Sequence, residues 1–428
     1  MEYLGLNEIK GELVILSGVK SPPPAFEEIV TIAVENGPPK LGRVIQVAED
    51  TAVVLVFEGT DGMSLTNTAT TFTGRQMEMK LSPLILGRIF DGLGRPRDGL
   101  GELMSGFSRT IFGKTTNPTN RVYPRNYVHT GFSAIDGLAT LIRGQKLPIF
   151  SADGLPHDKI AAQIATRAGA DAVVFAAMGV QHDTAEFFRR SFEESGTLDR
   201  TTIFLNLASD PPTERIATPR YALTAAEYLA YELGYHVLII LTDMTAYAEA
   251  VREISSAHGE IPSRKGYPGY MYSDLASIYE RAGIMKNSAG SLTQIPILTM
   301  PGEDITHPIP DLTGYITEGQ IVLDRQLHRR GIFPPINVLP SLSRLMKDGI
   351  GEGFTSADHA LLAGKLFAKY AEVGDARALL AIIGEEDLTD TDRELLEFGR
   401  KFETEFLTQQ DFENRSMEET LEIARGLV

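Results

Sequence analysis

Two short apolar runs set the strongest limit on how this chain can fold. Residues 172–177 (AVVFAA) and 237–241 (VLIIL) are continuous stretches without a polar side chain. Each is far shorter than the roughly 18 residues of a membrane-spanning helix, and such runs are typical of strands buried on both faces of a parallel sheet. An amphipathic helical pattern at residues 184–194 lies between them, so the sequence predicts parallel βαβ units with right-handed crossovers.

The same alternation of strand and helix patterns extends on both sides of these runs. The further predicted elements are strands at residues 146–150, 202–205 and 236–243 and helices at residues 159–168 and 224–233. This is the layout of a nucleotide-binding α/β domain, which we place at residues 76–345.

The N-terminal part of the chain has a different pattern. Short β-rich runs at residues 11–16, 42–47 and 52–57 are separated by proline- and glycine-rich breaks, and strands at such spacing are typical of a small barrel or sandwich. We therefore predict an N-terminal β-barrel at residues 1–75. A glycine-rich segment at residues 84–97 is typical of a connection into a new domain.

Helical spacing dominates the last part of the chain. Leu395, Phe398, Phe402 and Phe406 fall on one face of a predicted helix whose other face is acidic. We predict a C-terminal helical bundle at residues 346–428. The chain is thus expected to be a multidomain α/β protein, and three domains agree with its 428 residues.

Composition excludes several classes of function. The formal net charge is −17, and a field of this sign repels phosphate backbones, so we expect no nucleic-acid partner. The chain has no cysteine, which excludes disulfides, thiolate zinc sites and a cysteine nucleophile. The eight histidines do not fall at metal-ligand spacing, so we predict no metal site within the chain. The first residues lack the pattern of a signal peptide, and secretion is not expected.

The turn after the strand at residues 146–150 is the most informative segment. It lies between a strand and the start of a helix, where a phosphate-binding loop belongs. A working loop has the pattern GxxxxGK[ST], in which the lysine reaches the phosphates and the hydroxyl binds magnesium. Here no glycine precedes Lys159, no Ser or Thr follows it, and Asp153 adds a carboxylate. The residues fit a degenerate phosphate loop and an unrelated strand–helix turn equally well.

Two further positions bear on ATP hydrolysis. Asp243 ends an apolar strand, as a magnesium-binding aspartate of the Walker B type does, but it is equally well placed to cap the next helix. A hydrolytic enzyme would place a glutamate after the strand at residues 172–177 to polarise the attacking water. This chain has MGVQH at residues 178–182. Together these features argue against independent ATP hydrolysis.

Arg344 is a candidate for a residue that acts in the active site of a neighbouring chain. It follows the proline-rich stretch PPINVLPSLS at residues 334–343, just before the predicted helical domain. An arginine there can be projected toward a neighbouring chain, where a guanidinium stabilises the charge of a phosphoryl-transfer transition state. The alternative is a surface arginine paired with a carboxylate, which position alone favours.

Long stretches of the sequence resemble one protein family. They include TGFSAIDG at residues 130–137, RGQKLPIFS at 143–151, ERIATPR at 214–220, GYPGYMYSDL at 266–275 and the whole of residues 293–320. The chain strongly resembles the B subunits of the archaeal/vacuolar-type rotary ATPases, and the resemblance covers nearly its whole length.

The resemblance implies a fold and a set of partners. The fold is an N-terminal β-barrel, a RecA-like, P-loop-type α/β nucleotide-binding domain with a degenerate loop, and a C-terminal helical bundle. Three catalytic A subunits alternate with three non-catalytic, regulatory B subunits around a central shaft, and a peripheral stalk and a membrane ring couple ATP turnover to ion transport. Such a protein lies peripherally at the cytoplasmic face of the cell membrane.

The resemblance also assigns residues. Arg344 matches the arginine that the B subunit lends to the A-subunit active site, and ATP or ADP with magnesium binds at that interface. The degenerate nucleotide position maps to nine residues: Ser151, Ala152, Asp153, Gly154, Leu155, Pro156, His157, Lys159 and Asp243. Because Asp153 departs from the small residue frequent in the family, we expect no nucleotide to bind tightly to this chain alone. The acidic stretch at residues 381–389 resembles the helix–turn–helix that faces the shaft, and it fits a solvated turn equally well.

Two other functions stay open at this stage. One is a catalytically active ATPase motor subunit of the same architecture. It would need the GK[ST] end of the phosphate-loop pattern and a glutamate after the strand at residues 172–177, and this chain has neither. The other is a ring-forming nucleic-acid translocase, which would need a basic channel.

Overall fold

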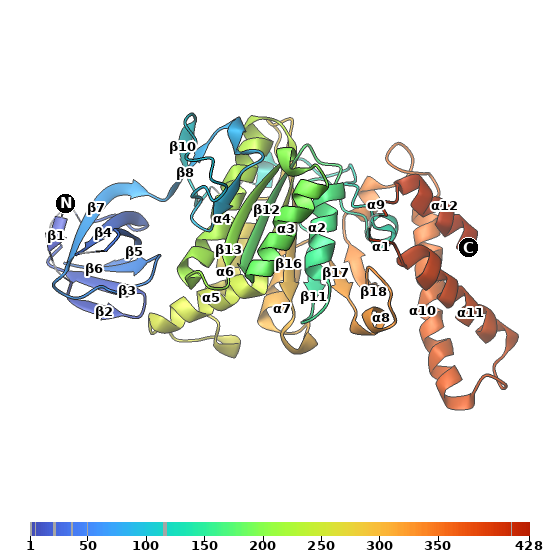
Figure 1. Cartoon of the computed structure of the whole chain (residues 1–428). Helices are drawn as coiled ribbons and strands as arrows, with labels where there is room; N and C mark the ends of the chain where they lie inside the picture. The colour runs from blue at the N-terminus through green and yellow to red at the C-terminus, as the bar shows by residue number, and fades with distance from the viewer. Residues whose placement is uncertain are drawn as a thin grey trace.

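The computed structural model describes residues 2–4, 6–19, 23–35, 37–48, 50–113, 118–411 and 413–428. Its parts lie in a row, with the N-terminal strands at one end, an α/β region in the middle and the last helices at the other end (Figure 1). The predicted fold class of β-barrel, nucleotide-binding-type α/β domain and C-terminal helices is confirmed. None of the helices within the described ranges is long and apolar enough to span a lipid bilayer.

The N-terminal region is one antiparallel sheet that curls into a barrel (Figure 1). Its strands, in sheet order, are β1 (Glu2–Leu4), β7 (Thr68–Gln76), β4 (Glu28–Val34), β5 (Lys40–Ala48), β6 (Thr51–Val56), β3 (Leu13–Ser17) and β2 (Glu8–Lys10). The outermost strands, β1 and β2, are neighbours in the chain, so the sheet wraps around one core. Alternate side chains point inward, and Val14, Val30, Ile32, Val44 and Val54 are completely buried.

The segment after the barrel adds a strand to the central sheet. Its elements are β8 (Glu78–Leu81), η1 (Pro83–Ile85), β9 (Ile89–Asp91), β10 (Phe107–Thr110) and η2 (Pro118–Asn120). Strand β9 pairs in parallel with β13 (Thr201–Leu207), and Phe90 stacks on Phe204 with ring centroids 5.3 Å apart. The glycine-rich segment at residues 84–97 is therefore more than the predicted connection, because its short apolar stretch forms an edge strand.

A large sheet forms the core of the central region. Its strand order is β18-β17-β11-β16-β14-β12-β13-β9, and β15 pairs with β16. The strands not yet given are β11 (Ile149–Ser151), β12 (Ala172–Val180), β14 (His236–Thr242), β15 (Gly283–Ile284), β16 (Ser291–Thr299), β17 (Gly319–Leu323) and β18 (Ile336–Ser343). Strands β15 and β18 pair antiparallel, and the other neighbours pair in parallel, as the apolar runs predict.

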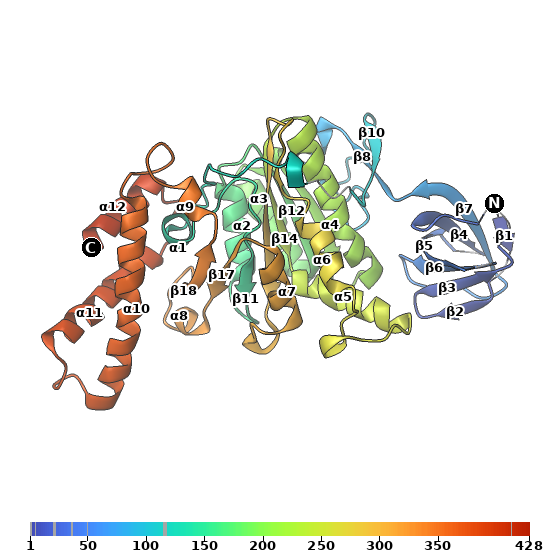
Figure 2. The same cartoon turned by 180° about the vertical axis from the view of Figure 1, so that it is seen from behind.

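Helices cover both faces of this sheet. Helices α2 (His157–Arg167) and α3 (His182–Glu194) lie on one face, and α4 to α7 lie on the other (Figures 1 and 2). The helical elements not yet given are α1 (Ser133–Leu138), η3 (Leu198–Arg200), α4 (Pro212–Glu227), η4 (Tyr228–Glu232), α5 (Met244–Ala257), η5 (Arg264–Gly266), α6 (Met271–Tyr279), η6 (Pro301–Glu303), α7 (Pro308–Ile316) and α8 (Arg325–Arg329). Helix α4 begins well before the predicted residue 224, because Pro212 fits a first helical turn and the interior Pro219 does not end the helix.

The C-terminal region is helical. Its elements are α9 (Met346–Gly349), α10 (His359–Ile383), α11 (Asp390–Lys401), η7 (Phe402–Leu407) and α12 (Met417–Leu427). Phe398, Phe402 and Phe406 are buried and stack in succession, with ring centroids 5.9 and 5.2 Å apart. The predicted apolar helix face is therefore present, with Leu395 half-buried at its start.

One buried carboxylate joins these helices to the central region. Glu403 accepts hydrogen bonds from Arg330, which follows α8, from Arg377 of α10 and from Tyr370, at 2.7–3.1 Å. Its side chain is 7% exposed. Burial alone would raise the pKa of Glu403, but the hydrogen bonds from Arg377 and Tyr370 outweigh burial and hold that pKa below its ordinary value.

We predict that Glu403→Ala loosens the C-terminal helices. The substitution leaves two arginines and a tyrosine without their acceptor, so we expect it to lower the free energy of unfolding by about 3 kcal/mol. Urea denaturation followed by circular dichroism measures this loss. The control is Glu397→Ala, which breaks a half-exposed pair with Arg400 and should cost below about 1 kcal/mol. Equal losses in the two variants would contradict the assignment.

Candidate functional site

The carboxyl ends of the parallel strands meet at one edge of the central sheet. Ser151 ends β11, Val180 ends β12, Leu207 ends β13, and Asp243 follows β14. In open α/β sheets, ligands bind in the crevice beyond the strand ends. The structure thus brings the loop at residues 151–159 and Asp243 to the same edge.

The loop is a tight turn held by its own hydrogen bonds. Ser151 is buried, and its hydroxyl oxygen lies 3.1 Å from Nδ1 of His157. The N–H of Leu155 donates to the carbonyl oxygen three residues earlier at 3.1 Å. Gly154 has a φ of +76°, which other residues rarely adopt. Pro156 then precedes His157, the first residue of α2.

A count that starts at Ser151, the last residue of β11, gives one alignment of the loop with the phosphate-loop pattern. That pattern, GxxxxGK[ST], has eight positions, and eight residues counted from Ser151 end at Asp158. His157 and Asp158 then stand where a working loop has its lysine and its magnesium-binding hydroxyl. The sequence pattern alone suggests Lys159 for that lysine, whereas the structure places Lys159 two residues into α2.

Lys159 is directed to the C-terminal region. Its Nζ lies 2.5 Å from Oδ1 of Asp411 and 4.4 Å from the ring centroid of Phe333. The backbone carbonyl of Asp411 also accepts hydrogen bonds from Gln163 and Arg167 of α2, at 2.7 and 2.6 Å. The positive charge of Lys159 is therefore compensated within the chain, and the contact joins α2 to the C-terminal helices.

Carboxylates dominate the charge of the loop. Asp153 is exposed. Burial raises the pKa of Asp158, His157 opposes the rise, and Asp243 adds to it. Asp243 itself accepts a hydrogen bond from the N–H of Thr245 at 2.7 Å, so it caps α5. Like charges repel phosphate oxygens, so the carboxylates of Asp153 and Asp158 weaken the binding of a nucleotide at this loop.

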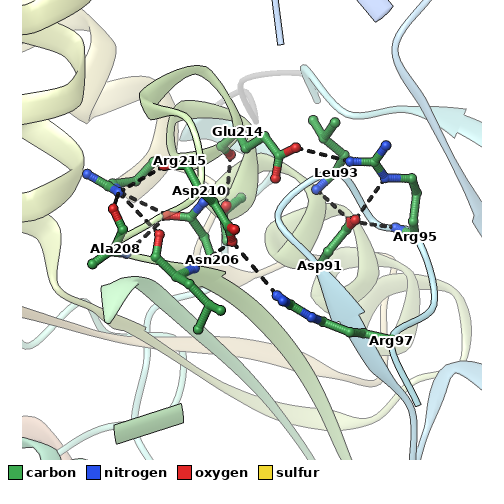
Figure 3. Close-up of polar contacts among 12 residues, drawn as sticks. Asp91, Leu93, Arg95, Arg97, Asn206, Ala208, Asp210, Glu214 and Arg215 are labelled. Carbon is green, nitrogen blue, oxygen red and sulfur yellow. Dashed lines mark hydrogen bonds and ion pairs between the residues drawn. The ribbon is translucent and has the colours of Figure 1, made fainter. Parts of the chain in front are cut away.

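A guanidinium fills the space beyond the end of β12. Nε of Arg215 donates to Oδ1 of Asn206 at 2.9 Å, and the same oxygen accepts from the N–H of Gly179 at 3.1 Å. A Cβ added at Gly179 would lie only 3.0 Å from Nε of Arg215. Figure 3 shows Arg215 held between Asn206 and the carbonyl of Ala208. The Arg215 guanidinium at the end of β12 is thus bonded within the chain.

Ion pairs next to Arg215 join three parts of the molecule, and Figure 3 shows those of Arg95 with Asp91 and Glu214. Arg95 donates to Asp91 at the end of β9, at 2.8 Å, and to Glu214 of α4, at 3.0 Å. It also lies 3.3 Å from Glu58, which follows β6 of the barrel. No local sequence pattern marks the whole network, because Glu58 and Glu214 are far from Arg95 in the chain and meet it only in the fold.

Arg344 lies elsewhere in the central region. It follows the edge strand β18, is exposed, and lines a groove of ≈ 250 Å³ beside α7. Its N–H donates to the carbonyl of Glu318 at 2.9 Å, and its Nη1 donates to the carbonyl of Thr317 at 3.3 Å. Within the described ranges no carboxylate pairs with it, so the surface ion pair considered from the sequence is not seen.

The structure does not bring the loop and Arg344 together. The loop leads into α2 on one face of the sheet, whereas the groove lies beside α7 on the other face (Figures 1 and 2). Phe150 of β11 lines the groove, and the next residue, Ser151, begins the loop. The two predicted sites are thus separate surfaces. In the part of the chain that the structure describes, no group of three or more His, Asp or Glu residues is arranged to hold a metal ion.

Comparison with protein families matches nearly the whole chain. The nucleotide-binding domain of the ATP synthase alpha/beta family matches residues 131–343. The beta-barrel domain of the same family matches residues 7–74, and the C-terminal domain of V and A type ATP synthase matches residues 348–428.

Individual relatives are similar over nearly their full length. The V-type ATP synthase beta chain 2 of Clostridium tetani is 58% identical over 431 residues, covering 99% of this chain and 93% of the relative. The B subunit of the A-type ATP synthase of Nitrosopumilus maritimus is 55% identical over 434 residues, covering 100% and 94%. The solved structure of the ATP synthase subunit NeqB from Nanoarcheaum equitans has a TM-score of 0.76 and 39% identity, covering 94% of this chain and 98% of that one.

We predict that Glu214 makes stability fall with rising pH. Burial raises the pKa of Glu214 to about 7, Arg95 opposes the rise, and Asp91, Asp210 and Glu58 add to it. A carboxyl whose pKa is raised by folding contributes stability that is complete below the unfolded-state pKa and is lost as pH rises through the folded-state pKa.

The measurement compares melting temperatures at pH 5 and pH 8. From pH 5 to pH 8 the free energy of unfolding should fall further in the native chain than in Glu214→Gln. The difference should be on the order of 1 kcal/mol after allowance for solvent screening. Glu193→Gln, at a surface pair with Arg189, is the control and should behave as the native chain does. The same pH dependence in the native chain and in Glu214→Gln would refute the prediction.

Proposed function

The chain belongs to the ATP synthase alpha/beta family, in its V- and A-type branch, and we propose that it is the non-catalytic, regulatory B subunit of a rotary ATP synthase or ATPase head. In that head it alternates with catalytic A subunits. Its own loop does not hydrolyse ATP, and Arg344 completes the active site of the neighbouring A subunit. The chain thereby helps to couple ATP synthesis or hydrolysis to ion transport across a membrane.

The observation that carries the proposal is the state of Arg344. Its guanidinium is exposed beside an open groove, and among the described residues it is held only by a weak contact to the carbonyl of Thr317. An arginine that stabilises charge in another chain's site must keep its own charge uncompensated until that chain arrives. The exposed side chain meets this requirement.

The loop supports the non-catalytic half of the proposal. His157 and Asp158 replace the lysine and hydroxyl of a working loop, and Lys159 is paired with Asp411. Since these residues weaken nucleotide binding at the loop, we place ATP or ADP with magnesium at the Arg344 interface. There the A subunit would supply the phosphate-binding groups, and this chain would supply the guanidinium.

The C-terminal hairpin supports a contact with a central shaft. Helices α10 and α11 project from the end of the molecule (Figure 1), and their turn carries exposed Glu385, Glu386 and Asp387 beside Ile382, which is 81% exposed. We place the shaft contact at this tip. A peripheral stalk and a membrane ion-translocating ring would complete the complex at the cytoplasmic face of the cell membrane.

We predict that Arg344→Ala leaves the complex with the A subunit assembled but lowers its ATP turnover at least about 1,000-fold, because an arginine supplied in trans contributes that much to phosphoryl transfer. Steady-state ATPase assays on complexes of verified mass measure the effect. Arg329→Ala, at an exposed arginine that ends α8, is the control and should retain normal turnover. Near-normal turnover in an intact Arg344→Ala complex would overturn the proposal.

The second candidate is a catalytically active motor subunit of the same architecture. It predicts ATP hydrolysis by the purified chain, whereas the degenerate loop and the absence of a glutamate at residues 178–182 predict none. We therefore expect no turnover by the chain alone, and turnover only after it is mixed with its A partner. ATPase activity of the purified chain that is lost in Asp243→Asn would establish the active-motor alternative.

A further inference from the structure

The groove that holds Arg344 also holds an exposed aromatic side chain. Tyr315, in the last turn of α7, is 76% exposed and lines the same groove as Arg344. Ile305, in the same groove, is 41% exposed, and Leu342, two residues before Arg344, is 44% exposed. Apolar side chains gathered around one polar group are typical of a surface that a partner covers.

The backbone fixes Tyr315 and Arg344 relative to each other. Arg344 donates hydrogen bonds to the carbonyls of Thr317 and Glu318, the two residues that follow α7. Lys146 holds the carboxylate of Glu318. Its backbone N–H donates to Oε2 of Glu318 at 2.8 Å, and its Nζ lies 2.7 Å from Oε1. These bonds fix the backbone directly after α7, and they thereby fix the positions from which the Tyr315 and Arg344 side chains extend.

The charge of Arg344 is not neutralised inside the groove. Among the residues that the structure describes, Asp311 is the one carboxylate that lines the groove, and it pairs with Arg264 at 3.2 Å. The contact from Nη1 of Arg344 to the carbonyl of Thr317, at 3.3 Å, is long for an N–H···O hydrogen bond. The guanidinium is thus free to turn, and fixing so flexible a side chain costs conformational entropy.

We propose that Tyr315 is a positioning residue for Arg344. When the A subunit covers the groove, the Tyr315 ring packs against the guanidinium and holds it extended toward the partner's nucleotide phosphates. A cation over an aromatic face is attracted by the ring, and the attraction strengthens when water is excluded. The ring is the active part, and its hydroxyl is not required. This inference rests on the proposed function, because it requires Arg344 to act in the partner's site.

The experiment is a double-mutant cycle in the assembled complex. Tyr315→Ala should lower kcat about tenfold, the size of a desolvated cation–π contact, and should change KM for ATP by less than about twofold. Tyr315→Phe keeps the ring and should retain kcat. In an Arg344→Ala background, which removes the cation, Tyr315→Ala should change the residual kcat by less than about twofold, because the tyrosine acts through the arginine. Tyr272→Ala, at a 51% exposed tyrosine of α6, controls for loss of a surface ring.

The outcomes separate this inference from the proposed function. Normal kcat in an intact Tyr315→Ala complex would overturn the positioning role while Arg344→Ala still abolished turnover. So would an undiminished effect of Tyr315→Ala in the Arg344→Ala background, or a Tyr315→Phe variant as slow as Tyr315→Ala. Normal turnover in Arg344→Ala would instead overturn the proposed function itself.

Discussion

Burial of both faces of the central sheet is the constraint on which the rest of this structure depends. The runs at residues 172–177 and 237–241 are apolar on both faces, so helices must cover both sides, and parallel strands then require crossovers. Every parallel strand therefore ends at the same edge, where the loop and Asp243 lie. Strand β18 runs the other way, so Arg344 lies near the opposite edge. The two candidate sites thus lie on separate surfaces of the chain.

Those two surfaces differ in how their cations are compensated. At the carboxyl edge, Lys159 pairs with Asp411, Arg215 bonds to Asn206, and Arg95 bonds to Asp91 and Glu214. These charges serve the fold, and they leave little positive potential for a phosphate. In the groove beside α7, Arg344 keeps its charge available. The distribution of compensated and uncompensated arginine and lysine is consistent with a chain that contributes to an active site in another subunit.

The sequence predicts the domain types and most central strands, because apolar runs and helical spacing are local signals. It does not show β9, a strand of three residues that exists only by pairing with β13. The sequence also does not show where α4 starts, because prolines stand at its first position and at residue 219, where a helix is not expected. The alignment of the loop depends on where β11 ends, and the true partner of Lys159 lies 252 residues away. The network around Arg95 likewise spans 119 residues to Glu214, so only the folded chain reveals it.

The open groove has a cost for a chain that has not yet met its partner. A groove that is lined by exposed Ile305 and Tyr315 and by an arginine without a carboxylate partner among the described residues can adhere to other proteins when nothing covers it. Free copies in excess of the partner would therefore associate with one another or with unrelated proteins. Under the proposed function, a matched supply of the A subunit would keep this surface covered.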